Sequence, residues 1–322
     1  MPGRATNDPS NYIAIGRQSA KDTEATTFYF LKHLDGSGFT PEPEVESLRE
    51  GGDGQEVGVR WRKLVKADGQ LVALARTEFT GNILAGVLGA QALTATAAGP
   101  LADITISPAA TLPYHTVDQA WADEQERNTN VVIGNVDIEF EAGMPLRITA
   151  GMVGGGTAYR PTQLLSPTRE TVRPFLYPGA SIVIAGASSA KVTKGKISIK
   201  RGLDDTIQTT GLSREDVVPL NQDYDVDLTL KYEDAVLYRR AHYGGGTTIA
   251  RDLATIGLEL FTQQGSHSLR LALPMLEIVG AQVNRLDPDG KTIFADVAAQ
   301  TVKSATSPMF AVIRRTGTTT FG

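Results

Sequence analysis

Three aspartates at alternate positions are the residues of this sequence best placed to do chemistry. Asp223, Asp225 and Asp227 are separated by single aromatic or apolar residues, so a β-strand here would carry all three carboxylates on one face. The pattern Asp-x-Asp-x-Asp also opens a calcium-binding loop. However, such a loop needs glycine at its sixth position and glutamate at its twelfth, where this chain has Leu228 and Asp234. The pattern therefore favours an acidic strand face over a metal site.

Other residue types that support catalysis or phosphate binding lack the spacing that those functions need. Glycine triplets at 154–156 and 244–246 are followed by threonine, not by the Lys-Ser or Lys-Thr of a phosphate-binding loop. There is no Gly-x-Ser-x-Gly nucleophile motif. The four histidines form no HxH or HxxxH pair; they are His33, His115, His242 and His267. We predict that the protein is not an enzyme and has no catalytic residues, cofactor or metal.

Composition narrows the function classes further. Of 322 residues, 41% are hydrophobic and 21% are charged, a balance typical of a globular protein. The formal net charge of −5, without a basic run, argues against binding nucleic acid through its phosphates. The chain has no cysteine, which excludes disulfides and thiolate sites. It has no apolar run of the roughly 18 residues that cross a bilayer and no apolar leader, so we expect a soluble protein made in a cytoplasm.

Alternating apolar and polar residues predict elements that are mainly β-strands. In the first half, a turn at 67–70 is expected to join two strands of a hairpin, and Thr80 is expected to cap a short helix. Residues 41–55 suggest a loop or hairpin tip, and 93–115 a long connection. Strands are expected at 26–31, 57–65, 71–79, 131–140 and 146–150.

The second half has the same sequence of elements. Residues 233–243 suggest a short helix, and turns are expected at 264–265 and 287–290. Strands are expected at 181–184, 196–200, 224–230, 255–261, 269–273 and 310–314.

Short matches between the halves suggest an internal duplication. The helix entry FTGNIL at 79–84 resembles YEDAVL at 232–237, and the strand VDIEF at 136–140 resembles IGLEL at 256–260. Chance similarity between amphipathic hairpins is the competing explanation. On the duplication reading the chain has five parts: an N-terminal arm (1–20), a first β domain (21–153), a linker (154–173), a second β domain (174–303) and a C-terminal strand and tail (304–322).

The pattern resembles the major tail tube proteins of siphovirus-like bacteriophages, of the duplicated-domain type. The resemblance rests on the entry segment IAIG at 13–16, the strand TFYFL at 27–31, the helical segments ILAGVLG at 83–89 and VLY at 236–238, and the strand at 135–141. It implies two tandem β-sandwich or half-barrel domains, each with a short flanking helix, together with extended loops and terminal arms. It also implies a virion protein assembled in the host cytoplasm.

The same resemblance implies a function in assembly. Three duplicated chains would form a ring of pseudo-sixfold symmetry, and stacked rings would form a hollow conduit for ejection of viral DNA. Partners would be further copies of the chain, the tape measure protein, and tail terminator or initiator proteins, with double-stranded DNA passing without specific binding. Apart from the resemblance, Asp223, Asp225 and Asp227 suggest either a solvated strand face or an acidic row facing the lumen that repels phosphates. We expect the terminal arms and the loops 41–56 and 93–115 to become ordered only on stacking.

Three other functions remain open. A tail terminator or adaptor would form a single ring without polymerising. A two-domain β-sandwich that binds carbohydrate or a receptor would need a cluster of exposed aromatic residues, which the sequence does not show. A β-rich hydrolase would need a nucleophile or an acid pair.

Overall fold

The computed structural model describes most of the chain. Described residues are 11–48, 59–95, 101–121, 124–160, 169–185, 187–188, 192–206, 214, 216–231, 236–243, 248, 253, 255–283, 294–301, 309–317 and 319–321.

The described residues form a mainly β fold, as predicted, with two short helices, α1 (Thr77–Leu88) and α2 (Val236–Tyr243). The strands of the first half are β1 (Tyr12–Arg17), β2 (Tyr29–Phe30), β3 (Gly38–Leu48), β4 (Val59–Leu74), β5 (Gly89–Ala95), β6 (Leu101–Pro108), β7 (His115–Trp121), β8 (Glu124–Glu141), β9 (Arg147–Gly154) and β10 (Gly156–Arg160). Those of the second half are β11 (Ser181–Ile184), β12 (Ala187–Ser188), β13 (Val192–Asp204), β14 (Val218–Lys231), β15 (Thr255–Gln264), β16 (His267–Val283), β17 (Phe294–Thr301) and β18 (Phe310–Thr316).

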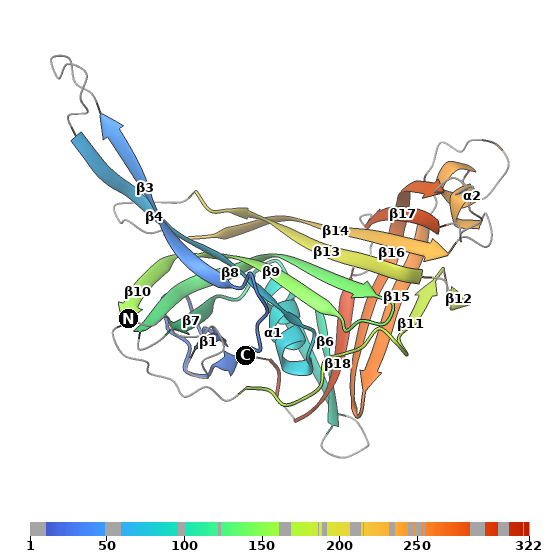
Figure 1. Cartoon of the computed structure of the whole chain (residues 1–322), viewed down its shortest axis with the longest axis horizontal. Helices are drawn as coiled ribbons and strands as arrows, with labels where there is room; N and C mark the ends of the chain where they lie inside the picture. The colour runs from blue at the N-terminus through green and yellow to red at the C-terminus, as the bar shows by residue number, and fades with distance from the viewer. Residues whose placement is uncertain are drawn as a thin grey trace.

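One antiparallel sheet runs through both halves of the chain. Its strands follow the order β3-β4-β9-β8-β13-β14-β17-β16. The halves meet where β13 pairs with β8, with Lys194 opposite Glu141 and Lys200 opposite Asn135. Because this junction is a hydrogen-bonded strand pair, the halves share a continuous sheet (Figure 1).

Two long strands carry this sheet into further layers. β16 also pairs with β15, which pairs with β11, and with β18, which leads to β6 and β5. The first part of β8 pairs with β7 and β10, and β7 pairs with β1. A strand of 17 or 18 residues is long enough to belong to two layers, which is how the sheet encloses a core.

The larger of two hydrophobic clusters among the described residues links the two halves. The cluster includes Ile83 and Leu84 of α1, Ile138 of β8, and Ile197 of β13, all fully buried. α1 lies inside the layers, whereas α2 covers the far end of β16 (Figure 1). α2 has no buried residue of its own, and its apolar side packs against the core through partly buried side chains.

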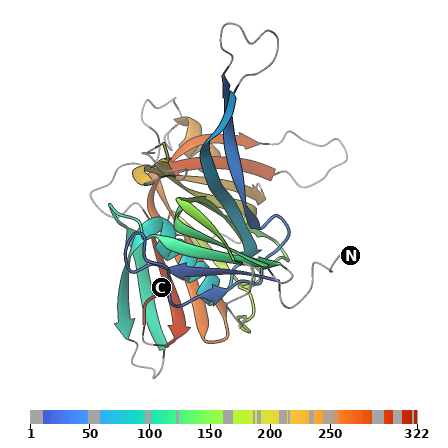
Figure 2. The same ribbon diagram turned by 90° about the vertical axis from the view of Figure 1, so that its left-hand side faces the viewer.

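The hairpin of β3 and β4 is longer than the sequence predicts. β4 runs through residues 67–70, where a turn was expected, so that prediction is wrong. Gly69 has an extended conformation, and an added Cβ would lie 2.5 Å from the carbonyl oxygen of Gly38 and 2.6 Å from the ring of Phe39. Glycine is needed here for the close approach of β3, not for a turn. The outer part of the hairpin projects away from the molecule (Figure 2).

Four further expectations differ from the structure. The stretch expected as a long connection contains β5 and β6. Within the expected N-terminal arm, residues 12–17 form the buried strand β1, because alternating isoleucines enter the core and the backbone pairs with β7. Thr80 is not the helix cap, since α1 begins at Thr77 after Arg76. The first part of the expected linker forms β10. The predicted turn at 287–290 lies outside the described residues.

Candidate assembly surfaces

The three aspartates singled out in the sequence lie on β14, on the face of the sheet that points away from the core. Tyr224 and Val226, which alternate with them, are buried, whereas Asp223 and Asp227 are exposed and Asp225 is half-buried. The strand periodicity therefore puts the carboxylates on one face, as predicted.

Lysines of the neighbouring strand β13 lie opposite these aspartates. Asp223 pairs in register with Lys200, and Asp227 with Lys196. The Nζ of Lys200 lies 2.6 Å from Oδ2 of Asp225, and this hydrogen bond raises the pKa of the lysine. The acidic row is thus partly neutralised within the same chain, which the sequence pattern did not indicate.

Acidic residues nevertheless outnumber basic ones on this face. Across β8, β9, β13, β14, β16 and β17, strand registers place eight carboxylates on this part of the face: Asp137, Glu139, Glu141, Asp223, Asp225, Asp227, Glu277 and Asp296. They place five cations there: Arg147, Lys194, Lys196, Lys200 and Lys231. The formal charge of the face is therefore negative, with a central basic stripe along β13 between acidic strands.

A groove of about 680 Å³ crosses the same face. Its walls come from β8, β13, β14, β17 and the end of β16, and Met144 of the β8–β9 turn lines it. Gly195 and Gly280 also line the groove. Its polar lining is of mixed sign, with Lys196 and Asp227 both present.

The projecting β3–β4 hairpin carries exposed apolar side chains. Val45 is 58% exposed and Trp61 is 42% exposed; Leu48 and Val59, also exposed, are directly opposite each other. Glutamates accompany them on β3, and arginines on β4. The register places Leu48, Val59 and Trp61 on one face of the hairpin and Val45 on the other. Exposed apolar side chains on a projecting arm are typical of a surface that contacts another protein.

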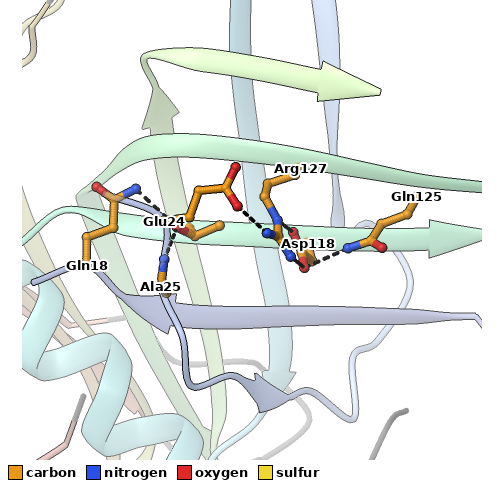
Figure 3. Close-up of polar contacts among 7 residues, drawn as sticks. Gln18, Glu24, Ala25, Asp118, Gln125 and Arg127 are labelled. Atoms are coloured by element: carbon orange, nitrogen blue, oxygen red, sulfur yellow. Dashed lines mark hydrogen bonds and ion pairs between the residues drawn. The ribbon is translucent and has the colours of Figure 1, made fainter. Parts of the chain in front are cut away.

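A buried ion pair fastens the segment after β1 to β7 and β8 (Figure 3). Arg127 donates from Nε to Oδ1 of Asp118 at 2.6 Å and from Nη2 to Oδ2 at 2.6 Å. Its third nitrogen, Nη1, contacts Glu24 at 2.5 Å. Gln125 donates to Asp118 at 2.7 Å. These bonds satisfy a fully buried carboxylate and raise the pKa of Arg127, so the network is structural.

The remaining candidates for chemistry are separated or structural. His115 is buried, and burial lowers its pKa to about 4, so it is neutral at pH 7. His242 lies on α2, where Nε2 is 3.0 Å from the carbonyl oxygen of Ala281. Among the described residues, no three His, Asp or Glu side chains come together as a metal site. The glycine triplet at 154–156 joins β9 to β10, and the triplet at 244–246 lies outside the described residues.

Comparison with protein families gives a match over nearly the whole chain. A family described as phage tail tube protein matches residues 10–311. The chain belongs to this phage tail tube family. Its members are structural and non-enzymatic, so the protein is a structural component of the phage tail. This agrees with the sequence-based expectation of a phage tail tube protein, and the mainly β fold agrees with it too.

No curated protein matches the chain. In the part of the chain that the structure describes, no helix is long and apolar enough to cross a membrane.

Proposed function

We propose that this phage tail tube protein is the major tube subunit, which forms trimeric rings of pseudo-sixfold symmetry that stack into a hollow conduit for viral DNA. The observation that carries the proposal is the junction of β13 with β8, which joins two halves of similar element order into one sheet. A hairpin, a helix and a hairpin occur twice, as β3–β4, α1, β8–β9 and as β13–β14, α2, β15–β16.

The same kind of strand junction between copies would continue the sheet around a ring. The two halves differ in how their hairpins pair: β4 pairs directly with β9, whereas β17 lies between β14 and β16. An assembly of three chains would therefore have approximate, not exact, sixfold symmetry. The division that we propose is into domains at 21–153 and 174–303, with the connecting segment 154–173 starting as β10 on the first domain.

We further propose that the acidic face of the sheet lines the bore. Its eight carboxylates against five cations would repel DNA phosphates and allow double-stranded DNA to pass without specific binding. In this arrangement Asp223, Asp225 and Asp227 form one acidic row of the lumen. Assembly in the host cytoplasm would use an initiator, the tape measure protein and a terminator as further partners.

Electron microscopy of the purified protein tests the assembly. Incubated at increasing concentration, the protein should form hollow tubes or stacked rings, and rotational averaging should give three repeating units with six similar lobes. Six identical subunits would exclude the trimeric ring. Single rings that never stack, even with a tail initiator complex added, would favour a terminator or adaptor.

Charge substitution tests the lumen assignment separately. D223N/D225N/D227N should slow DNA ejection from assembled particles, because the face loses its negative excess. Adding K194Q/K196Q/K200Q removes three cations from the same face and should restore ejection if net charge is the cause. Normal ejection by the triple aspartate variant would show that this row does not line the bore.

A further inference from the structure

The outer edge of β3 begins with a backbone position that is already capped. The amide nitrogen of Phe39 donates to Oε1 of Gln119 at 2.9 Å, and Nε2 of Gln119 donates to the carbonyl oxygen of Phe39 at 2.7 Å. These are the two hydrogen bonds that a neighbouring strand would make. Gln119 is buried on β7 and is held by a further bond to Glu126 at 3.1 Å. The side-chain amide therefore occupies the place of a partner strand.

Prolines block the next two outward positions. Because Phe39 points its backbone groups away from β4, the alternation of a strand points those of residues 41 and 43 the same way. Both residues are proline, Pro41 opposite Ala67 and Pro43 opposite Val65. Proline has no N–H, and prolines on an edge strand prevent the pairing of a further strand.

Beyond the prolines the edge is open. The irregularity between Glu44 and Val45 leaves an extra residue on β4, so the alternation of β3 continues unchanged. Val45 and Ser47 therefore direct their N–H and C=O groups outward, and both residues are exposed. This is the part of the hairpin that carries the exposed apolar side chains, which would be covered by a partner.

We propose that the β3 edge is divided: residues 39–43 are blocked against strand addition, and a second copy of this chain pairs with the edge through Val45 and Ser47. A second copy is the partner because tail tube proteins self-associate and because this chain already joins its halves by pairing β13 with β8. The block limits the ladder to the outer arm, so it fixes where the partner strand begins and weakens association of free subunits.

Restoring the missing donors tests the blocked part. P41T/P43T adds two outward N–H groups without removing any bond to β4. It should lower the concentration of half-maximal self-association, measured by sedimentation velocity, by roughly tenfold, as expected for two added hydrogen bonds. E42T is the control. It places threonine between the two prolines, at a residue whose backbone groups face β4, so it adds no outward N–H. An unchanged midpoint in P41T/P43T, or an equal shift in E42T, would show that the prolines block nothing.

Removing a donor tests the open part. S47P deletes one outward N–H, whereas S47A keeps it and loses only the hydroxyl group. S47P should raise the midpoint of self-association by about tenfold or abolish association, and S47A should match the unaltered chain. Equal behaviour of the two variants, or no association by the unaltered chain at any concentration, would overturn the pairing. The readout is association in solution, so a ring of unexpected symmetry would contradict the proposed trimer and leave this inference standing.

Discussion

The ring of Phe321 lies directly against the backbone of Gly81, in space that any other residue at that position of α1 would fill. Phe321 is 2% exposed although it is the penultimate residue of the chain. Its backbone exchanges two hydrogen bonds with the side chain of Gln91, at 2.8 and 2.9 Å, and Arg315 lies over its ring at 4.9 Å. The C-terminal tail is therefore packed onto the first half of its own chain, whereas we expected it to become ordered only when rings stack.

This contact predicts that the effect of G81A on stability changes sign when Phe321 is replaced by alanine. G81A should destabilise the protein, because the added methyl group overlaps the Phe321 ring. F321A should cost about 3 kcal/mol, as for other buried aromatic residues. In the F321A background the methyl group of G81A has room, and alanine should stabilise the helix by up to about 1 kcal/mol. Urea unfolding of the four proteins measures the effect, and a G81A cost that persists without the Phe321 ring would contradict the packing.

The buried pair of Arg127 and Asp118 predicts strong coupling. R127M or D118N alone should cost about 3–5 kcal/mol, since each leaves a partner buried without its counterion or hydrogen bonds. The double variant R127M/D118N should cost less than the sum of the two, because it leaves no buried charge. Thermal and urea unfolding of the unaltered protein, the two single variants and the double variant complete this double-mutant cycle. Additive effects would show that the two side chains do not stabilise each other. The exposed pair of Arg314 and Asp103 offers a control, for which we expect no more than about 1 kcal/mol.

Burial of His115 predicts a loss of stability in mild acid. Its pKa of about 4 in the folded protein lies below the ordinary 6.5, so the unfolded chain binds the proton more tightly. The free energy of unfolding should fall as the pH drops below 6.5 and level off below 4, with a loss of about 2 kcal/mol between pH 7 and pH 5 from this residue. H115Q should remove that part of the pH dependence. An identical slope in H115Q, measured by urea unfolding at both pH values, would exclude His115 as its source.

Helix α1 obtains a hydrogen-bond acceptor for its first turn from a distant segment. Oε1 of Glu170 accepts a hydrogen bond from the backbone N–H of Glu78 at 3.3 Å, and Oε2 accepts one from Tyr29 at 2.5 Å. E170A should therefore cost about 1–2 kcal/mol.

Thr80, which the sequence suggested as the cap, provides the matched control. Its hydroxyl is buried without a hydrogen-bond partner among the described residues, so T80V should be neutral or slightly stabilising. A larger cost for T80V than for E170A in thermal unfolding would restore the threonine as the residue that stabilises the helix start.

Local periodicity was enough to predict the mainly β fold, the last strand, the 255–273 hairpin and the common face of Asp223, Asp225 and Asp227. Each depends on which side of a strand a residue occupies, and residue type at every second position decides that. The same patterns led to the resemblance with tail tube proteins, which the match over residues 10–311 confirms. The turn at 67–70 was mispredicted because Asp-Gly favours a turn locally, whereas contact with Phe39 accounts for Gly69 in the fold.

Partners distant in the sequence were decided only by the tertiary structure. The pairing of β13 with β8, the lysines opposite the acidic row, the capping of Phe39 by Gln119 and the place of Phe321 against Gly81 all join residues far apart in the chain. No local pattern specifies such contacts, because each arises when the sheet closes around one core and brings the two surfaces together. The sequence alone determined which residues face inward, whereas packing determined which residues each of them contacts.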